Sequence, residues 1–360
     1  MKPKILILSI YPAPYRMELI SRFSDCYDMD VFFEHSGGDE RNAKWFSSGI
    51  FLMLDSEDGR AAYQKINLFD YAFVLFYDYA ESASRKLIIK CKLKRIPYVI
   101  NCDGVMMTPH GNPIKDLYKR FLISGASAYL ASGEHAKKYF LRYGAKENRI
   151  HIHPFSALVP EDFVDAPLSQ EEKRALRERL RLPIEGKLAI GVGRFIPLKR
   201  YGELITAWAN MPTDCNLLLV GGGREEETYR AIIKEKHLSN VVLEPFHTPV
   251  ELRDYYRASD LFVHPSSYEA WGLVINEAMA SGLPVLVSDH CTGGLELIKD
   301  GENGYKIPMG DEIALCEKAK ALLDSSEEFR VTMGKAALKT IQPYTLENMA
   351  KCQLATLETL

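Results

Sequence analysis

Two glutamates stand eight residues apart in the stretch from Leu261 to Asp289, in a context that suits ligand chemistry. Glu269 lies in a loop that follows a short apolar run, and Glu277 lies about two turns into the helix after that loop. A carboxylate accepts hydrogen bonds from a vicinal diol, which sugars and ribose both offer. Backbone N–H groups at the helix start suit a phosphate, and here they belong to Trp271, Gly272 and Leu273.

A glycine turn with two cations follows another apolar run, at residues 187–192. It reads Gly193-Arg194, with Lys199 five residues after the arginine. Cations at the carboxyl end of a strand suit a pyrophosphate, since each charged hydrogen bond contributes about 1.5–3 kcal/mol. Arg200 is the alternative second cation, and a solvated basic loop would be the better interpretation if this pattern stood alone. Gly221-Gly222-Gly223 lacks the G-x-G-x-x-G spacing of a nicotinamide site.

The first half of the chain offers weaker candidates. Asp103 ends a predicted strand at residues 97–102, and His110 follows in a Pro- and Gly-containing loop. Asp103 could instead cap a turn. Arg16 begins a helix after the first strand, where it could contact a phosphate or simply lie on the surface. His135 opens another helix, and we count it only as a candidate on the acceptor side.

The motif E-A-W-G-L-x-x-x-E-A-M-A-S-G-x-P-V resembles the signature of the family 4 retaining glycosyltransferases of the GT-B fold, also called glycosyl transferases group 1. The resemblance is strong over residues 187–307, weaker over 128–155 and generic over 1–127. It implies that Glu269 faces the transferred sugar and Glu277 the ribose of a nucleotide-sugar donor. The residues that it implies for donor binding are Gly193, Arg194, Lys199, Phe246, Glu269, Trp271, Gly272, Leu273, Val274 and Glu277.

The resemblance also implies the catalytic group, which comprises Asp103, Arg194, Lys199 and Glu269. Family members often have a histidine beyond the strand that ends here at Asp103, so His110 is the alternative for that role. Many members have a glycine-rich loop after the first strand, whereas this chain has Pro12 and Pro14. Arg16 is the substitute for that loop, and it joins His110 and His135 as acceptor-side candidates.

Strands and helices alternate twice along the chain, which predicts an α/β protein with two doubly wound, Rossmann-like domains and parallel sheets that face a cleft. We expect an N-terminal acceptor-binding domain, a linker with a charged helix, and a C-terminal donor-binding domain. Their bounds are residues 1–154, 155–183 and 184–343. In GT-B proteins the last helix, here residues 344–360, crosses back to the N-terminal domain.

Composition fits a cytoplasmic protein. The 360 residues are 47% hydrophobic and 26% charged, as in ordinary globular proteins. Seven scattered cysteines without a C-x-x-C pair indicate reduced thiols. The N-terminus predicts a first strand rather than a signal peptide, which argues against a periplasmic binding protein. His151 and His153 share a strand face, but without a third ligand we expect packing rather than a metal.

Charge is divided unevenly along the chain. Residues 1–153 contain 22 basic and 17 acidic residues, a net of +5, and the rest contains 23 and 31, a net of −8. Much of the excess lies in residues 85–95 and 115–120. A helix over 82–95 could simply have a solvated basic back, or it could bind anionic lipid, where each lysine contributes about 1 kcal/mol.

These observations predict a metal-independent retaining hexosyltransferase that moves a sugar from a UDP- or GDP-linked donor to a hydroxyl acceptor. We expect the acceptor to be a lipid-linked saccharide of cell-surface polysaccharide synthesis, met at the inner face of the cytoplasmic membrane. No cofactor and no nucleic acid are expected. A nucleotide-sugar epimerase of the same fold and a non-catalytic sugar-nucleotide-binding protein are the alternatives.

Overall fold

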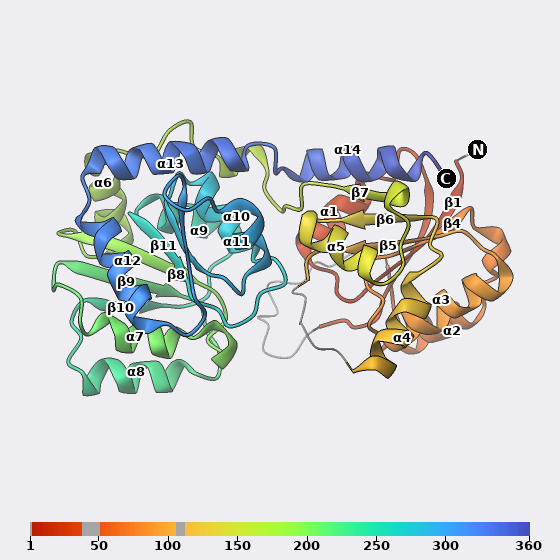
Figure 1. Cartoon of the computed structure of the whole chain (residues 1–360), viewed down its shortest axis with the longest axis horizontal. Helices are drawn as coiled ribbons and strands as arrows, with labels where there is room; N and C mark the ends of the chain where they lie inside the picture. Colours follow the sequence, from red (N-terminus) through yellow and green to blue (C-terminus); the bar gives the residue numbers. More distant parts are fainter. Residues whose placement is uncertain (1, 38–50, 106–111) are drawn as a thin grey trace. The chain divides into compact units, whose positions relative to one another are not determined.

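The computed structural model describes three segments of the chain, residues 2–37, 51–105 and 112–360. These residues form two compact units (Figure 1). Unit 1 comprises residues 1–157 and 345–360, and unit 2 comprises residues 158–344. The segment that we expected to link two domains is therefore counted mainly with unit 2.

Unit 2 contains six parallel strands in the order β10-β9-β8-β11-β12-β13. Most are short apolar runs, because helices cover both faces of the sheet. The chain begins in the middle with β8, adds β9 and β10 on one side, and then returns to place β11 beside β8. The strands are β8 Lys187–Val192, β9 Cys215–Val220, β10 Val241–Glu244, β11 Leu261–His264, β12 Val285–Ser288 and β13 Gly304–Ile307.

Two layers of helices sandwich this sheet (Figure 1). One layer contains α7 Tyr201–Trp208, α8 Glu226–Glu235 and α12 Glu312–Asp324. The other contains α6 Gln170–Leu180, α9 Pro249–Arg257, α10 Leu273–Ala280, α11 Thr292–Leu297 and α13 Glu327–Ile341. The sequence did not predict β13, an edge strand whose middle residues, Tyr305 and Lys306, are only half-buried.

The described residues of unit 1 form seven parallel strands in the order β3-β2-β1-β4-β5-β6-β7. The chain again begins in the middle, with β1, and reverses direction between β1 and β4. The strands are β1 Lys4–Ser9, β2 Asp28–Phe33, β3 Leu52–Met53, β4 Phe73–Phe76, β5 Tyr98–Cys102, β6 Ala128–Ala131 and β7 Ile150–Ile152. Two doubly wound sheets are therefore present, as predicted.

The C-terminal helix belongs to unit 1, which confirms its predicted return to the N-terminal domain. This helix, α14 Leu346–Leu357, packs on α1 Pro14–Ser21 and on β6. The other helices of the unit are α2 Glu57–Gln64, α3 Ser82–Lys94, α4 Pro113–Ile123 and α5 Glu134–Arg142. Buried side chains of α3, α4 and α5 share one hydrophobic core with the sheet.

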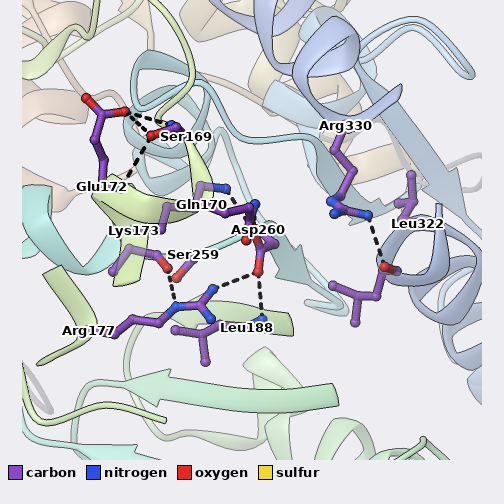
Figure 2. A network of polar contacts seen from close by, with 12 residues as sticks. Ser169, Gln170, Glu172, Lys173, Arg177, Leu188, Ser259, Asp260, Leu322 and Arg330 are labelled. Atoms are coloured by element: carbon purple, nitrogen blue, oxygen red, sulfur yellow. Dashed lines mark hydrogen bonds and ion pairs between the residues drawn. The ribbon is translucent and has the colours of Figure 1, made fainter. Parts of the chain in front are cut away.

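A buried ionic network fixes α6 to the sheet of unit 2 (Figure 2). Asp260, at the amino end of β11, accepts hydrogen bonds from Lys173 at 2.9 Å and Arg177 at 2.7 Å. The backbone N–H of Leu188 donates to the same carboxylate at 2.9 Å. These partners lower the pKa of Asp260 despite its burial, so the carboxylate stays ionised.

Two further features of the structure concern the cysteines and the possibility of a membrane-spanning helix. All seven cysteines are free of disulfides. Within the three described segments, no helix combines the length and apolar character needed to cross a bilayer.

Candidate active site

The candidate donor site lies at the carboxyl ends of β8 and β11. In a doubly wound sheet, ligands bind in the crevice where the strand order reverses, outside the carboxyl ends of the strands. In unit 2 that reversal lies between β8 and β11. Gly193 and Arg194 follow β8, and the loop with Glu269 follows β11. The fold thus brings the two predicted motifs to one edge of the same sheet.

Lys199 and Glu269 meet at this edge. Their side chains form an ion pair and are only 11% and 22% exposed. His264, the last residue of β11, places Nε2 3.4 Å from the same Glu269 oxygen. Burial alone would raise the pKa of Glu269, but Lys199 and His264 lower it to about 2. Glu269 is therefore a carboxylate at neutral pH.

His264 is a neutral donor in this cluster. Burial and the nearby Lys199 charge lower its pKa. Because the Glu269 carboxylate can only accept, Nε2 must carry the hydrogen. The imidazole also stacks on Phe262, with ring centroids 5.9 Å apart and planes 13° apart. His264 was not among the predicted site residues, although its position at a strand end just before the motif could have marked it.

Glycines allow close packing of the loops around this cluster. Gly221 packs so tightly that a Cβ there would lie 1.9 Å from the carbonyl oxygen of Gly193. The Gly193 loop is also tied to the triple-glycine turn by a hydrogen bond from Phe195 N to Gly222 O, at 2.8 Å. The loop that carries Arg194 and Lys199 is thereby fixed in place.

Two backbone hydrogen bonds join the loop after β11 to the start of α11. Thr292 N donates to Glu269 O at 3.1 Å, and Gly293 N donates to Trp271 O at 3.0 Å. A Cβ on Gly293 would approach that Trp271 oxygen to 2.4 Å. Gly272, with φ of 90°, caps α10, which begins at Leu273 as predicted.

Glu277 lies on α10, half-buried. Tyr256 of α9 donates its hydroxyl to Glu277 Oε2 at 2.8 Å. Burial raises the pKa of Glu277, the Tyr256 hydrogen bond opposes this rise, and the charge of Asp162 adds to it, which gives a pKa of about 7. The two predicted donor-binding carboxylates, Glu269 and Glu277, thus have pKa shifts in opposite directions. Tyr256 was also missed, because nothing in its local sequence marks it.

A separate polar network in unit 1 holds Asp103. Arg16 is 3% exposed and forms an ion pair with Asp103. Its guanidinium also lies over the Tyr77 ring, 3.7 Å from the centroid. Asn101 donates to the other Asp103 oxygen at 2.6 Å. The interpretation of Arg16 as a surface residue is therefore wrong, because the side chain is buried against these partners.

This network continues to the C-terminal helix. His153 places Nε2 3.2 Å from Asn101 Oδ1 and 3.4 Å from Gln353 Nε2. Tyr77 donates to Gln353 Oε1 at 2.8 Å. Burial and the Arg16 charge lower the pKa of His153 to about 3, so it is neutral. His153 is buried just beyond the end of β7, rather than within the strand as expected.

The other candidates lie at different places. His110 falls outside the described residues. His135 is half-buried in the first turn of α5, and Phe246 is half-buried just after β10. Arg200 pairs with Glu203 at 3.3 Å rather than with Glu269. Of the two alternative cations, Lys199 is therefore the one beside Glu269. Within the described residues, no group of three or more His, Cys, Asp or Glu side chains could hold a metal.

Sequence comparison relates the chain to known glycosyltransferases. The profile of the family described as Glycosyl transferases group 1 matches residues 172–340. The D-inositol 3-phosphate glycosyltransferase of Xylanimonas cellulosilytica is 32% identical over 255 residues, which are 68% of this chain and 60% of that protein. The amylovoran biosynthesis glycosyltransferase AmsD of Erwinia amylovora is 26% identical over 273 residues, 74% of this chain and 72% of that protein. In three of the relatives the chain spans 40%, 45% and 60% of their length.

Structural comparison agrees over almost the whole chain. HepE of Anabaena was solved in complex with UDP and glucose and superposes on this chain with a TM-score of 0.77 at 19% sequence identity. The match covers 99% of this chain and 100% of the HepE chain. WaaG, described as a glycosyltransferase involved in lipopolysaccharide biosynthesis, has a TM-score of 0.70 at 17% identity, with 98% of each chain covered. Residues 172–340 thus match the glycosyl transferases group 1 family, and almost the whole chain shares the GT-B fold of these solved glycosyltransferases.

Proposed function

We propose that the protein is a retaining glycosyltransferase that moves a hexose from a UDP- or GDP-linked donor to a hydroxyl acceptor. The observation that carries this proposal is the cluster of Lys199 and Glu269 beside the Arg194 loop, where β8 and β11 end. A cation and a carboxylate at one sheet edge suit the diphosphate and the sugar of one ligand. The family membership of residues 172–340 and the UDP and glucose in the HepE structure support the same donor class.

Each proposed step uses residues of this chain. Arg194 and Lys199 stabilise the charge that develops on the leaving diphosphate, and no metal or cofactor is required. Glu269 is ionised and faces the sugar, while Glu277 holds the ribose. The leaving phosphate takes the acceptor proton, and the sugar keeps its anomeric configuration. Asp103, fixed by Arg16 and Asn101, is the proposed catalytic residue of unit 1.

A donor screen tests the proposal. UDP, GDP, ADP and their sugars are added to the protein, and thermal unfolding is measured. A ligand at about 100 times its Kd should add about 2.7 kcal/mol of stability. Turnover of the selected donor with EDTA present should equal turnover without it. If none of the nucleotides raises the Tm, the donor assignment is wrong.

The two alternatives predict different outcomes with the selected donor. An epimerase would release free nucleotide or an isomerised sugar when no acceptor is present. A non-catalytic binding protein would bind the donor and show no turnover across a broad acceptor panel. NMR of the product from a transferase should show the same anomeric configuration as the donor.

We further propose that the acceptor is a lipid-linked saccharide, met at an anionic membrane surface on the cytoplasmic side. The supporting observation is an apolar stripe on α4, formed by side chains at i, i+3, i+4 and i+7 that are all exposed. Their exposed fractions range from 42% to 80%, for Ile114, Leu117, Tyr118 and Phe121. An exposed apolar helix face of this kind suits the boundary between headgroups and acyl chains.

Exposed basic residues also lie on α4 and on the neighbouring helix α3. Lys86, Lys90 and Lys94 are exposed on α3, which packs against α4. Lys115 and Arg120 are exposed on α4 itself. The combination of exposed apolar side chains on α4 with exposed basic residues on α3 and α4 favours an anionic bilayer over a solvated helix back.

Vesicle flotation separates the contribution of the basic residues to membrane binding from that of the apolar stripe on α4. Changing Lys86, Lys90 and Lys94 to Gln should weaken binding to anionic liposomes at low salt, since the Debye length is about 10 Å at 0.1 M and about 3 Å at 1 M. Changing Leu117 and Phe121 to Ser should weaken binding at both salt concentrations. The control replaces three exposed lysines of unit 2, Lys234, Lys236 and Lys335, and should have no effect. Equal flotation of all variants would contradict the membrane proposal.

A further inference from the structure

Tyr256 is the only hydrogen-bond donor that the described residues provide to the side chain of Glu277. The tyrosine is 2% exposed, and its hydroxyl lies 2.8 Å from Glu277 Oε2. Its ring packs edge-on against Phe262 of β11, with centroids 5.9 Å apart. A phenol held this tightly cannot swing away, so it fixes the direction of the carboxylate.

The helix that carries Tyr256 is itself anchored at both ends. Thr248 and Glu251 form a capping box at the start of α9. Arg253 pairs with Asp162 at 2.6 Å, and Arg257 donates to the Glu161 carbonyl at 3.0 Å. Tyr256 is therefore positioned by α9 as a whole, independently of any ligand.

We infer that Tyr256 is a positioning residue for the ribose of the donor: it holds Glu277 Oε2 so that the carboxylate presents its remaining acceptor sites to the 2′- and 3′-hydroxyls. This inference rests on the donor-binding function proposed above. Two hydroxyls on adjacent carbons need acceptors in a fixed plane, and a freely rotating carboxylate would present them only part of the time. Tyr256 also favours the ionised form of Glu277, against the burial that raises its pKa. An ionised carboxylate accepts both hydroxyl hydrogens, whereas a protonated one must donate as well.

The inference predicts discrimination between ribose and 2′-deoxyribose. Wild-type protein should bind the selected nucleoside diphosphate at least tenfold more tightly than its 2′-deoxy analogue, because the analogue leaves an acceptor unpaired. Tyr256→Phe removes the hydroxyl and keeps the ring. It should weaken binding of the ribonucleotide about five- to tenfold and bring the preference over the deoxy analogue to about twofold. Isothermal titration calorimetry measures both constants.

A double-mutant cycle shows whether Tyr256 acts through Glu277. If it does, Tyr256→Phe combined with Glu277→Gln should lose no more affinity than Glu277→Gln alone. Tyr255→Phe is the matched control, since Tyr255 is the adjacent buried tyrosine and its ring stacks on His247 instead. The control should keep wild-type affinity and wild-type preference for ribose.

The outcomes separate this inference from the proposed function. If wild-type protein binds none of the nucleoside diphosphates, the donor proposal fails and the inference with it. If wild type binds and Tyr256→Phe keeps its affinity and ribose preference, the inference alone fails. Equal binding of ribose and deoxyribose forms by wild type also overturns it. Should Tyr256→Phe not fold, Tyr256→Met fills the same space without a donor and takes its place.

Discussion

The two ends of β11 carry two buried ionic clusters of opposite design. At the amino end, Asp260 is about 1% exposed and accepts from Lys173, Arg177 and Leu188 N (Figure 2). Arg177 uses its other hydrogens on the carbonyls of Ala258 and Gly186, both at 2.9 Å. This cluster satisfies its charges internally.

At the carboxyl end, the cluster around Glu269 is left open. The Glu269 side chain is 22% exposed. Three buried atoms nearby have no hydrogen-bond partner among the described residues, namely Tyr201 Oη, His264 Nδ1 and Thr292 Oγ1. A buried polar atom without a partner costs about 1–3 kcal/mol. One strand can therefore carry a closed network for stability at one end and an incomplete network for binding at the other.

The largest expected effect is on stability, at the closed end. Asp260→Asn leaves Lys173 and Arg177 buried without their counter-charge and should lower the free energy of unfolding by about 3–5 kcal/mol. Because the folded pKa of Asp260 lies below its unfolded value near 4, this stabilisation is present above about pH 4 and is lost as the pH falls further. Urea unfolding measures it.

Glu269→Gln is the matched change at the open end. The Glu269 side chain is 22% exposed whereas that of Asp260 is fully buried, so the stability loss should be smaller, about 1 kcal/mol. Equal losses for the two variants would remove the distinction between the clusters.

The next largest expected effect is a loss of turnover when Lys199, in the open cluster around Glu269, is replaced. Lys199→Ala should lower turnover by about 100-fold and weaken binding of nucleoside diphosphate, as expected for the loss of one charge-stabilising contact. Steady-state kinetics with the selected donor measure it. Arg200→Ala is the control, since Arg200 pairs with Glu203 and should change turnover by less than about threefold. A larger loss for Arg200→Ala would make Arg200 the second cation.

A smaller effect concerns the ribose. Glu277→Gln should weaken the binding free energy of the donor by about 1.5–3 kcal/mol and so raise its Kd, because a charged acceptor is lost while the shape of the side chain is kept. Calorimetry measures the change, and Glu235→Gln, at the exposed end of α8, is the control. Wild-type affinity in Glu277→Gln would remove Glu277 from the donor site.

The smallest effect is a pH dependence of stability. The pKa of Glu277 is raised to about 7 by burial and by Asp162, while Tyr256 opposes the rise and Arg253 neutralises Asp162 in part. The folded state therefore binds more protons than the unfolded state between about pH 4.5 and 7, and stability falls as the pH rises through this range. Glu277→Gln should remove that fall from unfolding curves of the empty protein. Parallel curves for both proteins would contradict the raised pKa.

Much of the fold was readable from sequence because its signals are local. Apolar runs of strand length alternate with capped helices, so two doubly wound units follow from short stretches of chain. The motif around Glu269 and Glu277 and the Gly193-Arg194 turn are equally local, since each is contained in one strand–loop–helix segment. The family was recognisable for the same reason.

Contacts between distant segments were decided only by the tertiary structure. Lys199 and Glu269 are 70 residues apart, and Arg16 and Asp103 are 87 apart. Tyr256 and His264 have no motif of their own, and they matter only because packing of α9 and β11 places them on Glu277 and Glu269. Charge pairing across a sheet edge depends on strand order, which local patterns do not specify.

The helix α4 shows the same division between sequence and structure. The spacing of Ile114, Leu117, Tyr118 and Phe121 is visible in the sequence and by itself indicates an apolar helix face. Such a face normally packs on a core, and only the structure showed that Leu122 and Ile123 are buried there while these four are exposed. Sequence by itself determined the elements and the chemistry of the local motifs, because both depend on near neighbours. Tertiary structure decided burial, partners and exposure, because these depend on which distant surfaces come to cover each side chain.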